Sequence, residues 1–195
     1  MQLDTDPYLI RKTLEGDTKA FGQLVDKYQA FVFTIVIRMV KVREEAEEVA
    51  QDTFIKAYQS LANFRGDSKF SSWLYSIAYR KALDALRKNK KNNNIELIDD
   101  ITEGDCTVIE NALSFLESEE RKEAIQNCIM KLPEQEAAII TLFYFEEQSI
   151  KEIAEITALS EENIKVKLYR SRKKMFTLLK QNILPEYTET NGKAI

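Results

Sequence analysis

The sequence predicts an all-α protein made of two small helical domains, and three observations support this fold class. Only 5 of the 195 residues are glycine and 3 are proline, so few positions interrupt a helix. Apolar residues recur at intervals of three or four through long stretches of Glu, Lys, Ala, Leu and Ile. No valine-rich alternating stretch indicates a β-strand. The 44% hydrophobic content is enough for packed cores.

Charge divides the chain into three blocks. Residues 1–91 carry 16 Lys and Arg against 12 Asp and Glu, whereas residues 92–120 carry 9 acids and no Lys or Arg. Residues 121–195 carry 12 Lys and Arg against 11 acids. The acidic block begins with a polar stretch poor in aromatic residues, which is typical of a flexible linker. We therefore predict domains at 1–91 and 119–183, an acidic flexible linker at 92–118, and an unassigned tail at 184–195.

Composition argues against an enzyme. The chain contains no histidine, and its two cysteines, Cys106 and Cys128, stand far apart. This excludes most zinc sites and histidine-based acid–base catalysis, and isolated cysteines fit a reducing cytoplasm. The carboxylates between Glu44 and Glu48 spread around a helix instead of converging on a metal. We expect no catalysis, no metal and no cofactor.

Membrane insertion is not expected either. The longest apolar run, Phe31 to Val40, includes Thr34 and Arg38 and is about half as long as a membrane-spanning helix. The N-terminus carries Asp4 and Asp6, where a signal peptide would be basic. These features predict a cytoplasmic protein.

The N-terminal block begins with three expected helices. Gly16 is predicted to end a first helix that starts near Tyr8, and Asp17 is placed to cap the second. A third helix opens around Glu44, with Ala46, Val49, Ala50, Phe54 and Ala57 on its apolar side. Its other face presents Glu48, Gln51, Asp52 and Lys56. That face is either simply solvated or a docking surface for a partner.

The next segment is both aromatic and basic. Asn63 to Lys69 forms a polar loop that contains Gly66, and a helix follows it. Aromatic and basic side chains interleave there: Phe64, Phe70, Trp73, Tyr75 and Tyr79 with Arg65, Lys69, Arg80, Lys81 and Arg87. Rings beside cations suit single-stranded nucleic acid, because bases stack on rings while cations follow the backbone. The alternative is that the aromatic stripe belongs to the core.

Residues 149–174 have the pattern of a helix-turn-helix. Ser149 and Glu152 form a capping box, residues 157–160 interrupt the helix, and Ser160 is placed to cap a second one. The second helix buries a stripe made of Ile164, Leu168, Ser171, Met175 and Leu179 and leaves a basic face made of Lys165, Lys167, Arg170, Lys173 and Lys174. Such a helix fits the major groove of duplex DNA. The alternative is an ordinary helical hairpin with a solvated basic face.

The net charge of −4 is unusual for a protein that binds DNA unaided, because cations that neutralise phosphates supply most non-specific affinity. Either the basic faces are masked in the free protein, or a partner supplies most of the DNA affinity. Both alternatives make DNA binding conditional.

Five motifs in this order resemble the extracytoplasmic-function group of bacterial RNA polymerase sigma factors. They are LEGDTKAFGQLVDKY, EEVAQDTFIKAYQSL, FRGDSKFSSWLYSIAYRKALDALRK, LPEQEAAIITLFYFEEQSIKEIAEIT and the helix-turn-helix. The resemblance covers residues 8–91 and 119–180. It implies a sigma-2 domain, a linker and a sigma-4 domain, which together bind core polymerase and promoter DNA.

The resemblance also implies residue roles. Contacts with core polymerase, on the β′ clamp helices, would come from Glu48, Gln51, Asp52, Phe54 and Lys56, and the β flap would bind as well. Melting and capture of the minus-10 element would involve Asn63, Phe64, Arg65, Gly66, Asp67, Ser68, Lys69, Phe70, Trp73, Tyr79, Arg80 and Arg87. The minus-35 duplex would meet Ser160, Asn163, Lys165, Lys167, Arg170, Lys173 and Lys174. An anti-sigma factor is a further expected partner.

Two positions depart from the family pattern. Ala158 stands where the family often has glycine in the turn, which predicts a turn without a positive φ angle or with mild strain. Arg80 stands where the family commonly has asparagine, so the minus-10 sequence preference is open.

Two other classes of function compete with a sigma factor. A stand-alone helix-turn-helix regulator would need only the C-terminal block and would bind duplex DNA without polymerase. A carboxylate-dependent nuclease would need converging acids, which the sequence lacks.

Overall fold

The protein is described by a computed structural model, in which residues 5–89 and 118–190 are placed. These residues form eight α-helices and a short 3-10 helix, without a strand among them. The helices are α1 (Asp6–Leu14), α2 (Thr18–Val40), α3 (Arg43–Ser60), η1 (Leu61–Asn63), α4 (Phe70–Asn89), α6 (Ser118–Met130), α7 (Glu134–Tyr144), α8 (Ile150–Thr157) and α9 (Glu161–Thr190). The all-α prediction is confirmed for the described residues.

Helices α1 to α4 form the N-terminal bundle, with α2 packed against each of the other three. Asp17 caps α2, since its carboxylate accepts a hydrogen bond of 2.9 Å from the backbone N–H of Lys19. Gly16 reverses the chain before this cap with a φ of 101°, a conformation that favours glycine. Both predicted punctuation signals are confirmed. The first helix starts at Asp6, earlier than the expected Tyr8.

Helices α6 to α9 form the C-terminal bundle, in which α7 supplies more of the buried apolar side chains than any other helix. Helix α9 is longer than expected: it runs unbroken to Thr190 and so passes the predicted end of the domain at residue 183. Cys128 on α6 is buried and unpaired, and burial raises the pKa of its thiol. A buried, protonated thiol is an inert one.

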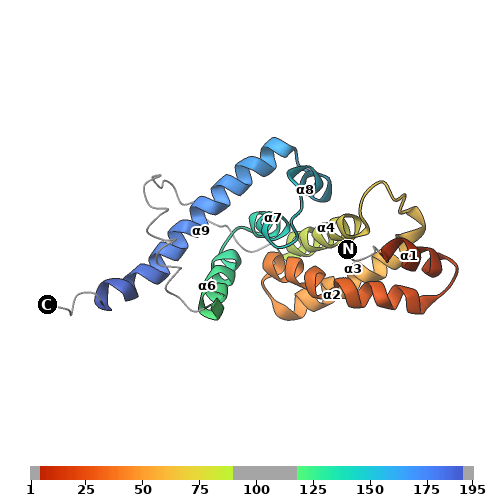
Figure 1. Cartoon of the computed structure of the whole chain (residues 1–195), viewed down its shortest axis with the longest axis horizontal. Coiled ribbons are helices and arrows are strands. Elements are labelled where there is room, and N and C mark those ends of the chain that lie inside the picture. Colours follow the sequence, from red (N-terminus) through yellow and green to blue (C-terminus); the bar gives the residue numbers. More distant parts are fainter. Residues whose placement is uncertain (1–4, 90–117, 191–195) are drawn as a thin grey trace.

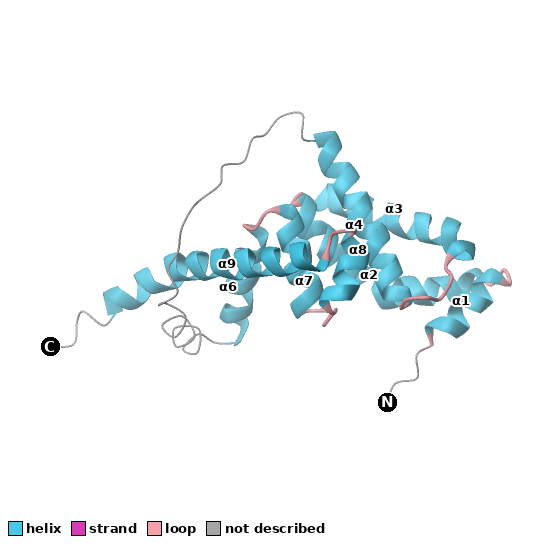
Figure 2. Cartoon of the chain, turned by 90° about the horizontal axis from the view of Figure 1, so that it is seen from above, coloured by secondary structure: helices cyan, strands magenta, loops and turns pink. Residues whose placement is uncertain are grey.

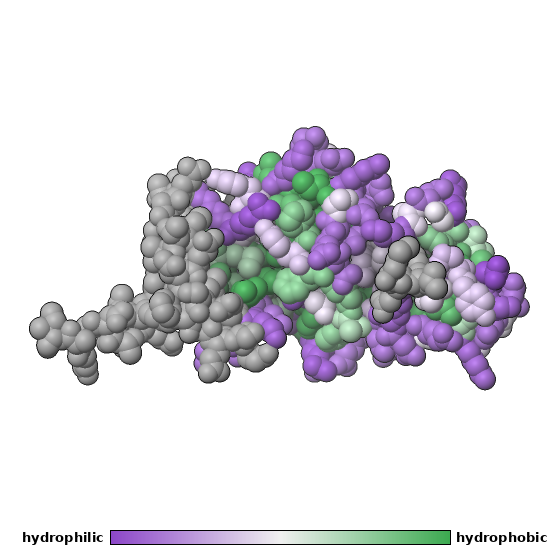
Figure 3. Space-filling model, in the orientation of Figure 1, coloured by the Kyte–Doolittle hydropathy of each residue, from purple (hydrophilic) through white to green (hydrophobic). Residues whose placement is uncertain are grey.

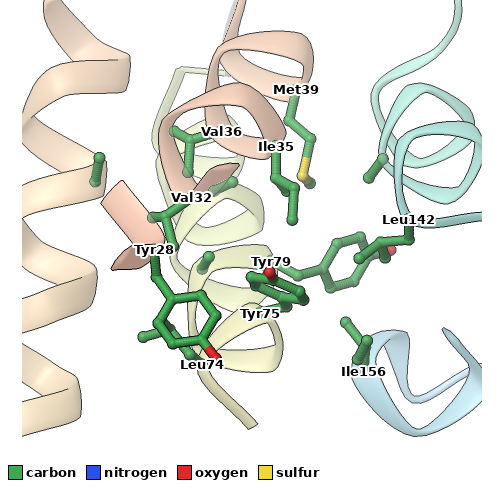
Figure 4. Packing of buried hydrophobic residues seen from close by; sticks show 14 of the residues in the cluster. Tyr28, Val32, Ile35, Val36, Met39, Leu74, Tyr75, Tyr79, Leu142 and Ile156 are labelled. Atoms are coloured by element: carbon green, nitrogen blue, oxygen red, sulfur yellow. The ribbon is translucent and has the colours of Figure 1, made fainter. Parts of the chain in front are cut away.

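The two bundles pack directly against each other. Helix α2 lies beside α7, and α4 lies beside α8 (Figures 1 and 2). One apolar cluster runs through both bundles, and Figure 4 shows Leu142 and Ile156 of the C-terminal bundle facing Tyr75 and Tyr79 of α4. This packing was not predictable from the sequence, because it depends on contacts between residues far apart in the chain.

The predicted linker, apart from Ser118 at the start of α6, and Cys106 lie outside the described residues. Within the residues that are described, no helix is both long and apolar enough to cross a bilayer.

Candidate nucleic-acid interface

The capping box that opens α8 is present in full. The backbone N–H of Ser149 donates to Glu152 Oε2 at 2.8 Å, and the backbone N–H of Glu152 donates to Ser149 Oγ at 3.2 Å. The bond from the Ser149 N–H, assisted by the ammonium of Lys69, lowers the pKa of Glu152 to about 2. This geometry satisfies two backbone donors that a helix start would otherwise leave unpaired.

The turn between α8 and α9 has one strained residue. Ala158 has φ 58° and ψ 32°, a left-handed conformation that glycine adopts more easily. The expectation of a turn without a positive φ is therefore wrong, and the alternative of mild strain is confirmed. Ser160 then accepts a hydrogen bond of 3.3 Å from the backbone N–H of Asn163, as its predicted capping role requires.

Helix α9 buries one stripe and turns its basic side chains away from it. Ile164, Leu168 and Ser171 are buried, as predicted. Ser160, Asn163, Lys165 and Arg170 are exposed, while Lys167, Lys173 and Lys174 are half-buried. None of these five cations forms an ion pair within residues 5–89 and 118–190. The face therefore presents uncompensated positive charge.

Two apolar side chains lie on the same face of α9, and the sequence analysis missed both. Val166 is 45% exposed and Tyr169 is 58% exposed. Their spacing of three places them next to each other, close to Arg170 and Lys173 on the helix surface. The sequence did contain a signal for them, because both are apolar residues outside the buried stripe. An exposed apolar side chain on such a helix can contact the thymine methyl group, which is one way to read a base pair.

The loop before α4 is anchored by three aromatic rings. The ring centroids of Phe64 and Trp73 lie 5.3 Å apart, and those of Phe64 and Phe70 lie 5.8 Å apart. Asn63 and the residues from Arg65 to Lys69 are exposed around this anchor. Gly66 has a φ of 78°, which explains a glycine in the loop. The result is a polar loop tip on a fixed aromatic base.

Two of the predicted DNA-contacting rings lie in the core. Phe70 is 4% exposed and Tyr79 is 1% exposed, so neither has a surface on which a base could stack in this arrangement. The core alternative for the aromatic stripe holds at these two positions. Trp73 and Phe64 are half-buried and keep part of their surface accessible. The hydroxyl of Tyr79 has no hydrogen-bond partner among the residues that the structure describes, and burial raises its pKa to about 12.

The cations of the loop and of α4 differ in their partners. Arg65 and Arg80 are exposed and form no ion pair within the described part of the chain. Arg87 lies 3.2 Å from Asp84 one turn earlier on the same helix. The ammonium of Lys69 lies 2.9 Å from Glu152 of α8. The loop is therefore tied to the helix-turn-helix by charge.

The outer face of α3 carries four of its five predicted docking residues. Glu48, Gln51, Asp52 and Lys56 are exposed, whereas Phe54 is half-buried and packs against the apolar cluster. Two side chains that the sequence analysis did not select are also exposed on this helix, Ile55 at 55% and Tyr58 at 45%. Beside this face, a polar groove of about 580 Å³ runs between α3 and α4.

An apolar groove of about 380 Å³ lies where α6, α7 and α9 meet (Figure 3). Ile125, Ile129, Ile140, Phe176 and Leu179 are among its lining residues. Among the described residues that line it, Arg172 is the charged one; its Nε donates to the hydroxyl of Tyr144 at 2.6 Å and its guanidinium lies over that ring. The groove is suited to an apolar helix or peptide.

No group of three or more acids and cysteines that could hold a metal occurs among the described residues. The carboxylates from Glu44 to Glu48 lie along α3.

The family models for sigma-70 region 2 and sigma-70 region 4 match residues 24–92 and 122–175. The RNA polymerase sigma-H factor of Pseudomonas aeruginosa is 34% identical over 178 residues, which cover 87% of this chain and 91% of the relative. The ECF RNA polymerase sigma factor SigW of Bacillus subtilis is 34% identical over 172 residues, which cover 84% and 90%. The ECF RNA polymerase sigma-E factor of Escherichia coli K12 is 34% identical over 174 residues, which cover 86% and 91%.

Two solved structures share the fold. The structure of CnrH in complex with the cytosolic domain of CnrY matches with a TM-score of 0.58 and 23% identity, over 92% of this chain and 99% of that one. The sigma factor RpoE of Bartonella quintana, in complex with the anti-sigma factor NepR, matches with a TM-score of 0.62 and 19% identity, over 84% and 99%. By its two matched regions and its curated relatives, the chain belongs to the extracytoplasmic-function group of the sigma-70 family of RNA polymerase sigma factors.

Proposed function

We propose that this chain is the promoter-specificity subunit of RNA polymerase and that it divides its work among three surfaces. The observation that carries the proposal is the occurrence of sigma-70 regions 2 and 4 in one chain, each with an exposed polar or basic face. The outer face of α3 binds the polymerase, the loop at 63–69 with α4 captures the melted strand, and α9 reads the duplex. Catalysis belongs to the polymerase, so the chain acts where the polymerase works, in the cytoplasm.

The docking surface on α3 consists of Glu48, Gln51, Asp52, Ile55 and Lys56. Its acidic side chains are exposed around one apolar residue, Ile55, which is 55% exposed. Interfaces of this kind derive most of their energy from a central apolar contact with charged residues at the rim. The β′ clamp helices of the core polymerase are the partner that the family implies for this surface.

The minus-10 surface consists of the loop at 63–69 and the exposed side chains of α4. Arg65, Lys69, Arg80 and Arg87 supply cations for the backbone of a single strand, and the accessible parts of Phe64 and Trp73 supply rings for bases. Flipping a base out of the duplex costs a few kcal/mol, which contacts of this kind recover. Phe70 and Tyr79 support the surface from within the core in the arrangement described above.

The minus-35 surface lies on α9. Asn163, Lys165 and Arg170 are exposed near the start of the helix, where a recognition helix meets base edges. Lys167, Lys173 and Lys174 are placed to contact phosphates, which position the protein without reading sequence. We add Val166 and Tyr169 to this surface, because both are exposed between these polar residues.

The apolar groove between α6, α7 and α9 is our proposed site for the β flap. It provides an apolar channel with Arg172 at its edge, which suits an amphipathic helix that carries an acidic residue. Binding there would leave the outer face of α9 accessible to DNA, because the groove is lined by side chains on the other side of that helix.

An anti-sigma factor is a further proposed partner. The RpoE structure that shares this fold is a complex with the anti-sigma factor NepR. Such a partner would explain how a chain with cationic surfaces is kept inactive until it is needed.

A stand-alone helix-turn-helix regulator is the alternative to be excluded. Gel filtration with core polymerase and a duplex-binding assay separate the two functions. A sigma factor co-elutes with core and binds promoter DNA far more tightly in that complex than alone. Tight, specific duplex binding by the chain alone, together with no core complex, would contradict the proposal.

A further inference from the structure

A buried carboxylate at the start of α1 belongs to none of the surfaces proposed above. Asp6 is 5% exposed and lies in the first turn of α1. Its carboxylate accepts a hydrogen bond from the hydroxyl of Tyr28 on α2. The ammonium of Lys27, on the same helix, donates to it at 2.6 Å. These bonds tie the first turn of α1 to the middle of α2.

The ring of Tyr28 leads from this carboxylate to the start of α4. Its centroid lies 5.7 Å from that of Phe70, the first residue of α4, and 6.3 Å from that of Tyr75 on the same helix (Figure 4 shows Tyr28 beside Tyr75). Tyr28 and Phe70 are both buried. Because the backbone holds one end of the Tyr28 ring and Asp6 holds the hydroxyl at the other, this carboxylate sets how the ring lies against Phe70.

Phe70 in turn supports the loop at 63–69, here called the minus-10 loop. Its ring centroid lies 5.8 Å from that of Phe64 and 5.6 Å from that of Trp73. Those two rings supply the accessible aromatic surface of the proposed minus-10 site. A continuous series of contacts therefore leads from Asp6 to the minus-10 loop, and a close-packed interior transmits small displacements along such a series.

The bonds of Asp6 are better suited to fixing geometry than to adding stability. Taking a carboxylate out of water costs free energy, which its partners largely return. What such bonds add is direction, since a hydrogen bond to an ionised acceptor is short and well aligned. Apolar side chains in the same places would fill the space but would not fix the orientation of the Tyr28 ring.

We infer that Asp6 is a positioning residue for capture of the minus-10 strand: it holds the hydroxyl of Tyr28, and Tyr28 holds Phe70, the ring that supports the minus-10 loop. The inference rests on the proposed function, which assigns that loop to the melted strand. It gives α1, which lies outside the proposed binding surfaces, a part in promoter opening.

Fluorescence of the free chain tests the structural half of this inference. Trp73 is the single tryptophan of the chain, so its emission reports on the base of the minus-10 loop. Tyr28→Phe keeps the ring and removes only the hydroxyl that Asp6 binds, and it should raise the acrylamide quenching constant of Trp73 while helical circular dichroism stays unchanged. Thr53→Val is the matched control, because it removes another buried hydroxyl, whose bond to the carbonyl oxygen of Val49 stays within α3. Equal quenching of Tyr28→Phe and the wild type would overturn the inference.

A second measurement uses the complete holoenzyme and separates strand capture from duplex recognition. Tyr28→Phe and Asp6→Ala should each weaken binding of a single-stranded minus-10 oligonucleotide by about tenfold, because each removes a hydrogen bond to a charged acceptor from the strand-competent arrangement. The double variant should bind as the single variants do, since both changes remove the same bond. Binding of the minus-35 duplex should be unchanged in all three, which a general loss of folding would not allow.

The conservative variant Asp6→Asn keeps an oxygen that can accept from Tyr28, so it should restore most of the strand affinity. Full strand binding by Tyr28→Phe, losses that multiply in the double variant, or an equal loss in Thr53→Val would overturn the positioning role and leave the proposed function intact. Wild-type holoenzyme that binds the oligonucleotide no more tightly than core polymerase alone would contradict the proposed function, and this inference with it.

Discussion

The ammonium of Lys81 on α4 lies 3.0 Å from a carboxylate oxygen of Asp52 on α3. This ion pair joins the helix that we assign to the melted strand to the helix that we assign to polymerase. Because both groups are near the surface, the pair adds little to stability and is easily exchanged for other partners. A polymerase contact that engages Asp52 on α3 would therefore change the partner of Lys81 on α4.

The docking face on α3 gives the first prediction. Ile55→Ala should weaken binding to core polymerase by about tenfold or more, because truncating a central apolar contact costs more than about 1 kcal/mol. The matched control is Leu14→Ala on α1, since Leu14 is 54% exposed and Ile55 is 55% exposed. Titration with fluorescently labelled core polymerase measures both. Equal losses in the two variants would remove Ile55 from the interface.

Arg170→Ala should weaken recognition of the minus-35 duplex by about 1–3 kcal/mol if the side chain contacts a base. Competition between specific and scrambled upstream sequences, measured with the complete holoenzyme, reports this loss. Opening of a promoter that is already melted at the minus-10 element should be unaffected. A comparable defect on the pre-melted template would place Arg170 in a different role.

Removing the buried hydroxyl by Tyr79→Phe should stabilise the free chain. The native hydroxyl has no partner within residues 5–89 and 118–190, and an unsatisfied buried donor costs about 1 kcal/mol or more. Urea unfolding followed by circular dichroism should therefore show a higher midpoint for the variant. A drop in unfolding free energy would show that the hydroxyl makes a hydrogen bond in the folded protein.

Acid should weaken the helix-turn-helix through Glu152. Its pKa is lowered from 4.5 to about 2, so its ionised form stabilises the folded state above pH 4.5, and this contribution is lost as the pH falls toward 2. The difference in Tm between the wild type and Glu152→Gln should be largest near neutral pH and should shrink over this range. A difference that does not change with pH would contradict the assigned bonds from Ser149 and Lys69.

Local features of this chain were predictable from the sequence because the interacting residues are close together. The capping bonds of Ser149 with Glu152 and of Ser160 with Asn163 span three positions each, and a helix start fixes their geometry. The basic face of α9 follows from helical periodicity in the same way. The turn at Ala158 was harder, because alanine adopts its left-handed conformation only when the surrounding helices impose it.

Features that depend on the two bundles meeting were not predictable. Ser72 and Gln148 are 76 positions apart, and no periodicity relates them. The burial of Tyr79 is a consequence of the same contact. The spacing of the aromatic residues in the sequence was therefore compatible with both a core position and a base-binding surface. Ile55, Val166 and Tyr169 were missed because their importance lies in exposure, which a repeating apolar pattern does not report.

Promoter-directed transcription by core polymerase with and without this chain tests the central claim most directly. Transcripts from a library of genomic promoter fragments should appear only when the chain is present, should start at defined positions and should share upstream minus-35 and minus-10 sequences. Core polymerase that forms no stable complex with the chain, or that initiates at the same positions without it, would contradict its assignment as a promoter-specificity subunit.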